Sequence, residues 1–65
     1  MGKTYSSRKV IQILSADGWY HAATQGDHYQ FKHPTKPGKV TVPHPKKDLS
    51  KYVIQSIKKR SGLDL

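Results

Sequence analysis

The absence of cysteine from a chain of 65 residues is the constraint that most narrows its possible folds. Without cysteine no disulfide can form, and a zinc site of the thiolate kind is ruled out. A chain this short buries only about 60% of the surface that its unfolded form exposes. We therefore expect a single small domain over residues 1–65, held together by a modest hydrophobic core.

The charge balance indicates a polyanionic partner. Twelve Lys and Arg residues stand against four acidic ones, for a formal net charge of +8 and a pI near 10.0. So much positive charge on a small surface attracts nucleic acid, an anionic membrane or an acidic protein. A role in solubility alone stays open as the alternative, and charge does not separate RNA from DNA.

The sequence predicts a protein that works inside the cell. No run approaches the roughly 18 apolar residues that cross a membrane. Residues 1–5 have no apolar core after their charge, so they do not read as a secretory signal. We expect the protein to act in the cytoplasm.

Two segments have the periodicity of amphipathic helices. The first covers residues 6–17, where Ser6 or Ser7 can cap the start and Gly18 can end the helix. The second follows Ser50 and closes at Gly62, with Leu63 folding back in a Schellman ending. Their apolar stripes are formed by Val10, Ile13, Leu14, Val53, Ile54 and Ile57.

Three segments between the helices read as strands, over residues 19–24, 28–33 and 39–43. The middle one alternates, so that Tyr29, Phe31 and His33 share one face and His28, Gln30 and Lys32 share the other. Short turns rich in Gly and Pro join them into an antiparallel meander. The predicted fold is α+β, with the order α-β-β-β-α, a three-stranded antiparallel sheet and both helices on one face. This is the layout of the double-stranded-RNA-binding domain.

Histidine is the residue type left for catalysis. The chain has no cysteine and no glutamate, and no glycine-rich phosphate loop is present. The four histidines lack the spacing of a metal site, so we predict no metal and no cofactor. His33 is expected to close a strand, and His44, between two prolines, to be structural or to face a phosphate.

His28 differs from the others because it follows a Gly-Asp turn and begins a strand that also carries Gln30 and Lys32. An imidazole can move a proton at neutral pH, and a lysine can offset the charge of a phosphorane. This combination suits metal-free attack of a ribose 2′-OH on the adjacent phosphodiester. On spacing alone, a plain surface histidine is the alternative.

The remaining candidates are predicted to bind RNA through phosphates and bases. They are Lys32, Lys36, Lys39, Lys46 and Lys47, together with Gly26, Gln30 and Tyr29. A solvated basic face without a defined track is the alternative for the lysines. Tyr29 can stack on a base or pack in the fold, and Trp19 is expected in the core.

The chain closely resembles the HicA family of toxins in residues 26–34 (GDHYQFKHP), in residues 39–45 (KVTVPHP) and in Leu49, Ile57 and Gly62-Leu63. The resemblance covers residues 6–63. It implies an mRNA interferase that is paired with a HicB antitoxin, with His28 in the place of the family's catalytic histidine. The family commonly has a small hydroxyl residue where this chain has Asp27, and a carboxylate there can hold the imidazole or repel an RNA phosphate.

Three hypotheses follow. The first is a metal-independent endoribonuclease toxin inhibited by a HicB-type partner. The second is a non-catalytic RNA-binding module with the same fold, in which His28 is dispensable. The third is a protein-interaction domain, which strong salt-dependent RNA binding would contradict.

Overall fold

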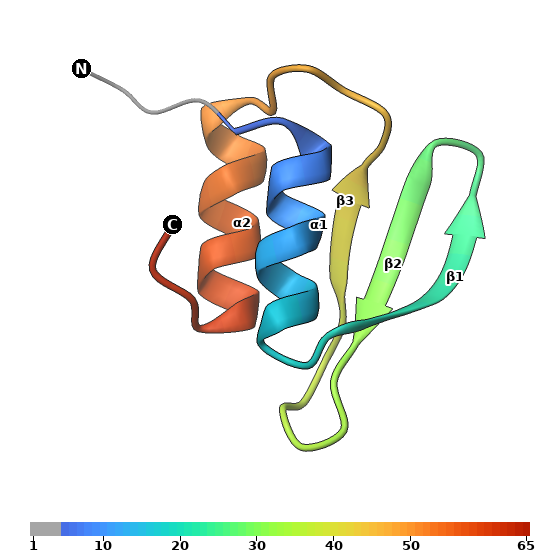
Figure 1. Cartoon of the computed structure of the whole chain (residues 1–65), viewed down its shortest axis with the longest axis vertical. Helices are drawn as coiled ribbons and strands as arrows, with labels where there is room; N and C mark the ends of the chain where they lie inside the picture. The colour runs from blue at the N-terminus through green and yellow to red at the C-terminus, as the bar shows by residue number, and fades with distance from the viewer. Residues whose placement is uncertain (1–4) are drawn as a thin grey trace.

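The structure, a computed structural model, describes residues 5–65. The chain runs through α1 (Ser7–Ala16), β1 (Tyr20–Gln25), β2 (His28–Lys32), β3 (Val40–Pro43) and α2 (Lys51–Ser61) (Figure 1). The predicted α-β-β-β-α order is confirmed, and each element lies within about one residue of its predicted bounds. The expectation about a secretory signal falls mainly on residues 1–4, outside the described residues. No helix in residues 5–65 is long and apolar enough to cross a membrane.

The three strands form one antiparallel sheet in the order β1-β2-β3. His28 pairs with Gln25 on one side and with Pro43 on the other. The register of β1 shifts between His21 and Ala23, so β1 carries a bulge there. His28 therefore lies at the end of the sheet where the β1–β2 turn and the end of β3 meet.

The core is small and comes from every element except β1. It contains Val10, Leu14, Trp19, Phe31, Val40, Val42, Leu49 and Ile57. Trp19 is only 2% exposed, which confirms its predicted place in the core, although it precedes β1 and is not part of it. The alternation predicted for β2 is also confirmed, because Phe31 is buried and Lys32 is exposed.

The two helices cover only part of the sheet. Both pack against β3, and they lie side by side along it in Figure 1. Every residue of β1 is exposed, so the hairpin of β1 and β2 extends beyond the helices. The helical face of the sheet is thus open over β1, in addition to the opposite face that was expected to be open.

The helix ends follow the sequence with one difference. Ser6 and Ser50 are the N-caps, as predicted, and each hydroxyl accepts a backbone N–H of the first turn. Gly62 closes α2 in the left-handed conformation, and Leu63 packs against the core. The predicted Schellman ending was wrong, because its pair of hydrogen bonds does not form. The Gly62 N–H donates to the Lys58 carbonyl at 3.0 Å, and the Leu63 N–H donates to Ser61 Oγ at 3.2 Å.

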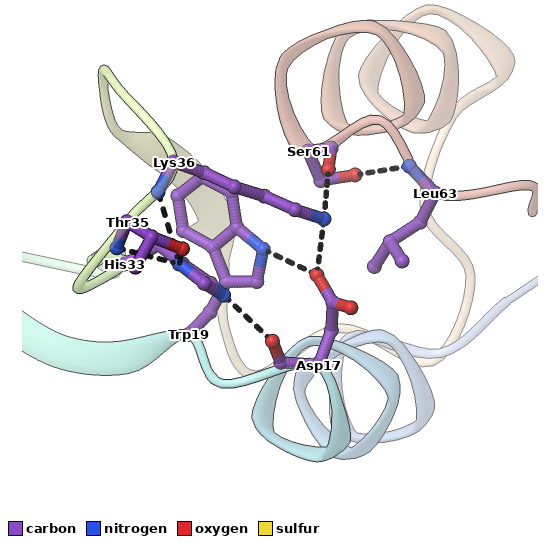
Figure 2. Close-up of polar contacts among 7 residues, drawn as sticks. All are labelled: Asp17, Trp19, His33, Thr35, Lys36, Ser61 and Leu63. Atoms are coloured by element: carbon purple, nitrogen blue, oxygen red, sulfur yellow. Dashed lines mark hydrogen bonds and ion pairs between the residues drawn. The ribbon is translucent and has the colours of Figure 1, made fainter.

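A polar cluster, which we call the Asp17 clasp, joins the C-terminal ends of both helices to the sheet (Figure 2). It consists of Asp17, Trp19, His33, Lys36 and Ser61. Asp17 Oδ2 accepts hydrogen bonds from Lys36 Nζ at 2.5 Å and from the Trp19 indole at 3.2 Å. Lys36 Nζ also donates to the Ser61 carbonyl at 3.1 Å, and the His33 ring reaches the Asp17 carbonyl at 2.7 Å.

His33 is fixed by both of its ring nitrogens. Nδ1 accepts hydrogen bonds from the backbone N–H groups of Thr35 and Lys36, each at 3.1 Å. The proton of the neutral ring is therefore on Nε2, which donates to the Asp17 carbonyl. This confirms that His33 closes β2, because the ring turns away from the ladder to hold the next loop.

The first prediction concerns the pH dependence of the Asp17 clasp. The hydrogen bond from Lys36 lowers the pKa of Asp17, partial burial opposes this, and the positive charge of Lys36 adds to it. A lowered pKa means that the ionised carboxylate stabilises the fold above its ordinary value of about 3.9, and that this contribution is lost as the pH falls below it. We expect Asp17→Asn to lower the melting temperature at pH 7, and the difference from the parent to shrink towards pH 3.

Asp64→Asn is the matched control, because the Asp64 side chain is 99% exposed and lies 3.7 Å from Lys58. An exposed pair of this kind contributes little. A pH-independent difference between Asp17→Asn and the parent would contradict the assigned role of the Asp17 charge.

The second prediction concerns Gly18, which joins α1 to Trp19. Its φ is 101°, and a Cβ there would lie 2.8 Å from His33 Nε2, an atom held in place by the clasp. Gly38 also has a positive φ, of 80°, but nothing lies within 4 Å of a Cβ at that position. Backbone strain alone costs about 1–3 kcal/mol.

We expect Gly18→Ala to lower the melting temperature more than Gly38→Ala does, since it adds a steric clash to the same backbone strain. Each kcal/mol corresponds to roughly 4–8 °C in a domain of this size. Thermal unfolding followed by circular dichroism measures both variants. Equal losses would mean that His33 moves aside freely.

Candidate functional site

His28 lies at an exposed corner of the sheet. It is the first residue of β2 and follows the two-residue turn of Gly26 and Asp27. Gly26 has a φ of 59° and Asp27 does not have a positive φ, which is the pattern of a type II′ hairpin. Nothing lies within 4 Å of a Cβ at Gly26, and the His28 side chain is 59% exposed. A ligand can therefore approach both the turn and the imidazole.

Asp27 contacts His28 without holding it. The closest approach is 3.6 Å, between Asp27 Oδ1 and His28 Nε2, and both side chains are more than half exposed. This distance is too long for a hydrogen bond. The contact is an exposed ion pair when the ring is protonated, and pairs of this kind are weak. The carboxylate is close enough to repel a phosphate but does not fix the ring.

The hydrogen bonding of the four histidines separates His28 from the others. His21 and His44 each have one ring nitrogen near a hydroxyl oxygen, at 2.5 Å and 2.6 Å respectively. His33 has both nitrogens in hydrogen bonds. His28 has no hydrogen bond from its ring to any of residues 5–65, and its side chain is more than half exposed, so both ring nitrogens are open to a ligand.

Three predicted RNA-binding residues lie on the open face with His28. Gln30 and Lys32 follow it at every second position of β2, and Lys32 is exposed. Lys39 Nζ donates to Gln30 Oε1 at 3.3 Å, so Lys39 reaches across from the start of β3. This face thus combines one imidazole with two ammonium groups.

Lys36 lies elsewhere. Its ammonium group is held between Asp17 and the Ser61 carbonyl in the Asp17 clasp (Figure 2). The positive charge is already paired with a carboxylate, and the side chain is only partly exposed. Contact with RNA stays a prediction for Lys36, whereas its role in joining the helix ends is visible in the structure.

Lys46 and Lys47 line a hollow beside the start of α1. The hollow measures about 330 Å³, and its walls are Ser6, Ser7, Arg8, His44, Pro45, Lys46 and Lys47. Ser7 is 1% exposed, and its hydroxyl contacts the His44 ring and accepts the Lys46 N–H at 2.9 Å. The buried hydroxyl thereby fixes the loop between β3 and α2. Among the residues that the structure describes, none with a carboxylate lines this hollow.

Tyr29 is half-buried in an aromatic row made of His21, Tyr29 and His44. Its ring stacks on His21, with centroids 4.9 Å apart, and meets His44 edge-on, also at 4.9 Å. Tyr29 pairs with Val42, which is buried, so the row lies on the helical side of the sheet. The row extends across the part of the sheet that the helices leave open.

Two members of this region were not predicted from the sequence. His21 had no assigned role, and Arg8 was placed only on the solvent side of the first helix. In the sequence, His21 is marked only by the two aromatic residues that precede it at the start of the first strand. Arg8 is marked only by the two serines before it. His44 was expected to be structural or to face a phosphate, and the contact with Ser7 confirms the structural part.

Within residues 5–65, no group of three or more His or Asp side chains lies close enough to hold a metal ion. The side chains at the corner and along its open face supply an imidazole, an amide, two ammonium groups and the Asp27 carboxylate. Such groups can move a proton and neutralise a phosphate. Both are needed to cleave a phosphodiester through a neighbouring hydroxyl.

The third prediction separates the roles of His28 and His33 in stability. His28→Ala removes an exposed side chain with no hydrogen bond, so the free energy of unfolding should stay within about 0.5 kcal/mol of the parent. His33→Ala removes four hydrogen bonds of the ring, at about 0.5–1.5 kcal/mol each. Urea unfolding at pH 7 measures both, and a large loss in His28→Ala would contradict the exposed placement.

A comparison with protein-family models places the sequence in a known family. The model described as the HicA toxin of bacterial toxin–antitoxin matches residues 7–63. The matched stretch begins with α1 and continues past the end of α2. It therefore includes the His28 corner and the loop between β3 and α2 that carries Lys46 and Lys47. No curated protein matches the chain significantly.

Proposed function

The chain belongs to the HicA toxin family of bacterial toxin–antitoxin systems, and from that membership we propose that it is an endoribonuclease that cleaves mRNA. The observation that carries the proposal is the state of His28. Its ring is exposed, lies beside a tight turn and is free of hydrogen bonds to residues 5–65. A general acid or base needs such a ring, because its nitrogen must reach the proton that it moves.

In the proposed reaction the ribose 2′-oxygen attacks the adjacent phosphorus and the 5′-oxygen leaves. The products are a 2′,3′-cyclic phosphate and a 5′-hydroxyl. His28 takes the proton of the 2′-hydroxyl or gives one to the departing 5′-oxygen, and solvent water makes the other proton transfer. Lys32 and Lys39 share the open face with His28 and offset the negative charge that develops on the phosphorane. No metal or other cofactor takes part in this proposal.

The proposed partner besides mRNA is a HicB-type antitoxin that covers His28 and the basic surface. A net charge of +8 favours an antitoxin with an acidic contact surface, because opposite charges speed the encounter of two proteins. We also propose that the chain forms one HicA-like domain and acts in the cytoplasm.

A non-catalytic RNA-binding module is the second candidate, and Asp27 is the observation that favours it. Its carboxylate lies 3.6 Å from His28, where the phosphate of a substrate would approach. If this repulsion prevents a productive geometry, the basic surface would still bind RNA. The two candidates differ in whether the protein cleaves RNA through His28.

The fourth prediction tests this difference. We expect induced expression of the parent chain in a bacterial host to arrest growth and break down mRNA, and His28→Ala to do neither. With purified protein, His28→Ala should cut RNA about 10²- to 10⁴-fold more slowly, the usual contribution of general acid–base catalysis. Cleavage by the parent should persist in a chelator.

Asp64→Asn serves as the control, since Asp64 lies at the exposed C-terminal end. Equal growth arrest in the parent and His28→Ala would favour the RNA-binding module. Normal growth in both strains with folded, soluble protein would contradict the toxin proposal, and Asp27→Ser would then show whether the carboxylate is the cause.

A further inference from the structure

We propose that the helical side of the sheet holds a second RNA contact, a subsite for single-stranded nucleotides that flank the cleaved bond. In this subsite a nucleobase stacks on the aromatic row of His21, Tyr29 and His44, and a backbone phosphate enters the hollow beside Arg8, Lys46 and Lys47. The inference rests on the proposed function, because it assigns part of the same RNA substrate to a new surface.

The first support is the open aromatic surface. His21 pairs with Phe31, so its ring lies on the buried face of β2, but His21 itself is exposed because no helix covers β1. Its ring is stacked on Tyr29 with an interplanar angle of 24°. Aromatic rings that are exposed on a sheet are the usual platforms for unpaired bases.

The second support is the charge of the adjacent hollow. Within residues 5–65, three cationic side chains and no carboxylate line its roughly 330 Å³, and all three are exposed. The N–H groups of Ser7 and Lys9 at the start of α1 are already taken, by the Lys46 carbonyl and by Ser6 Oγ. The charged side chains are therefore the main groups that an anion would meet here, and their positive charge is complementary to that of a phosphate.

The third support is that His44 belongs to both features and lies next to His28. His44 is in the aromatic row and also lines the hollow. It follows Pro43, the pairing partner of His28, and its N–H donates to the Asp27 carbonyl at 2.7 Å. An RNA strand with its scissile phosphate at His28 therefore meets this subsite directly over the end of the sheet.

The shape of the surface selects for a single strand. Base stacking on the row requires an unpaired nucleotide, because a base inside a duplex does not present its face. The phosphate contact then adds salt dependence. For single-stranded nucleic acid, the slope of log K against log salt changes by about 0.7 for each phosphate neutralised.

The fifth prediction tests the subsite by binding and not by cleavage. Every protein carries His28→Ala, and a fluorescein-labelled single-stranded RNA of mixed sequence is titrated at several KCl concentrations. We expect Arg8→Ala to reduce the salt slope by about 0.7. Lys59→Ala is the matched control. It also removes one positive charge, but from the last turn of α2, which does not line the hollow.

The stacking contact has its own pair of variants. His21→Ala should weaken RNA binding by about five-fold or more, the equivalent of one lost base stack. Tyr52→Ala removes an aromatic ring that is 82% exposed on α2, outside the row, and should leave binding unchanged. Circular dichroism confirms that each variant is folded.

The outcomes distinguish this inference from the proposed function. Equal effects of Arg8→Ala and Lys59→Ala, together with equal effects of His21→Ala and Tyr52→Ala, would overturn the subsite, and cleavage by the parent would still support the ribonuclease. Variants that weaken binding of the antitoxin but not of RNA would assign this surface to the partner protein and overturn the subsite as well. Absence of both RNA binding and cleavage would overturn the subsite and the ribonuclease together.

Discussion

The ion pair between Asp17 and Lys36 is the interaction on which the rest of this small structure depends. Eight buried apolar residues make up its core, and β1 contributes none of them. The Asp17 carboxylate accepts hydrogen bonds from the Lys36 ammonium and from the indole of the buried Trp19. Lys36 also donates to the Ser61 carbonyl at the end of α2. An unpaired indole N–H in the core would be costly. One carboxylate thus satisfies the core polar group and joins both helix ends.

The Asp17 clasp lies at the end of the molecule away from the proposed site. It joins the C-terminal ends of α1 and α2, whereas α1 and β2 both begin at the opposite end of the molecule (Figure 1). His28 is the first residue of β2, and the start of α1 lines the basic hollow. The helices pack on β3 and leave β1 exposed, so the hairpin that carries His28 is held through β2 and its ladder. Side chains at the end that we propose to bind RNA, such as His28, can therefore be exposed without weakening the core.

Local patterns in the sequence were enough for the elements but not for their long-range contacts. Helical periodicity, the serine caps and the glycine stops predicted both helices, and alternation predicted β2, because these signals act over a few residues. Lys36 shows the limit. Its neighbours suggested one more free lysine, yet it is paired with Asp17, 19 residues earlier. The exposure of β1 was missed for the same reason, since the area that two short helices cover depends on their packing.

The histidines show which part of a site can be read before the fold is known. His28 begins β2 and His33 directly follows its end, and the turn before His28 already distinguished the two in the sequence. The aromatic row could not be predicted, because His21, Tyr29 and His44 come from three segments that meet only through the register. The effect of Asp27 follows from the same geometry. Its exposed charge lies at the β1–β2 turn, 3.6 Å from the His28 ring, and makes no hydrogen bond to it. Salt screens exposed charges, so the effect of Asp27 on an approaching phosphate is confined to the His28 corner.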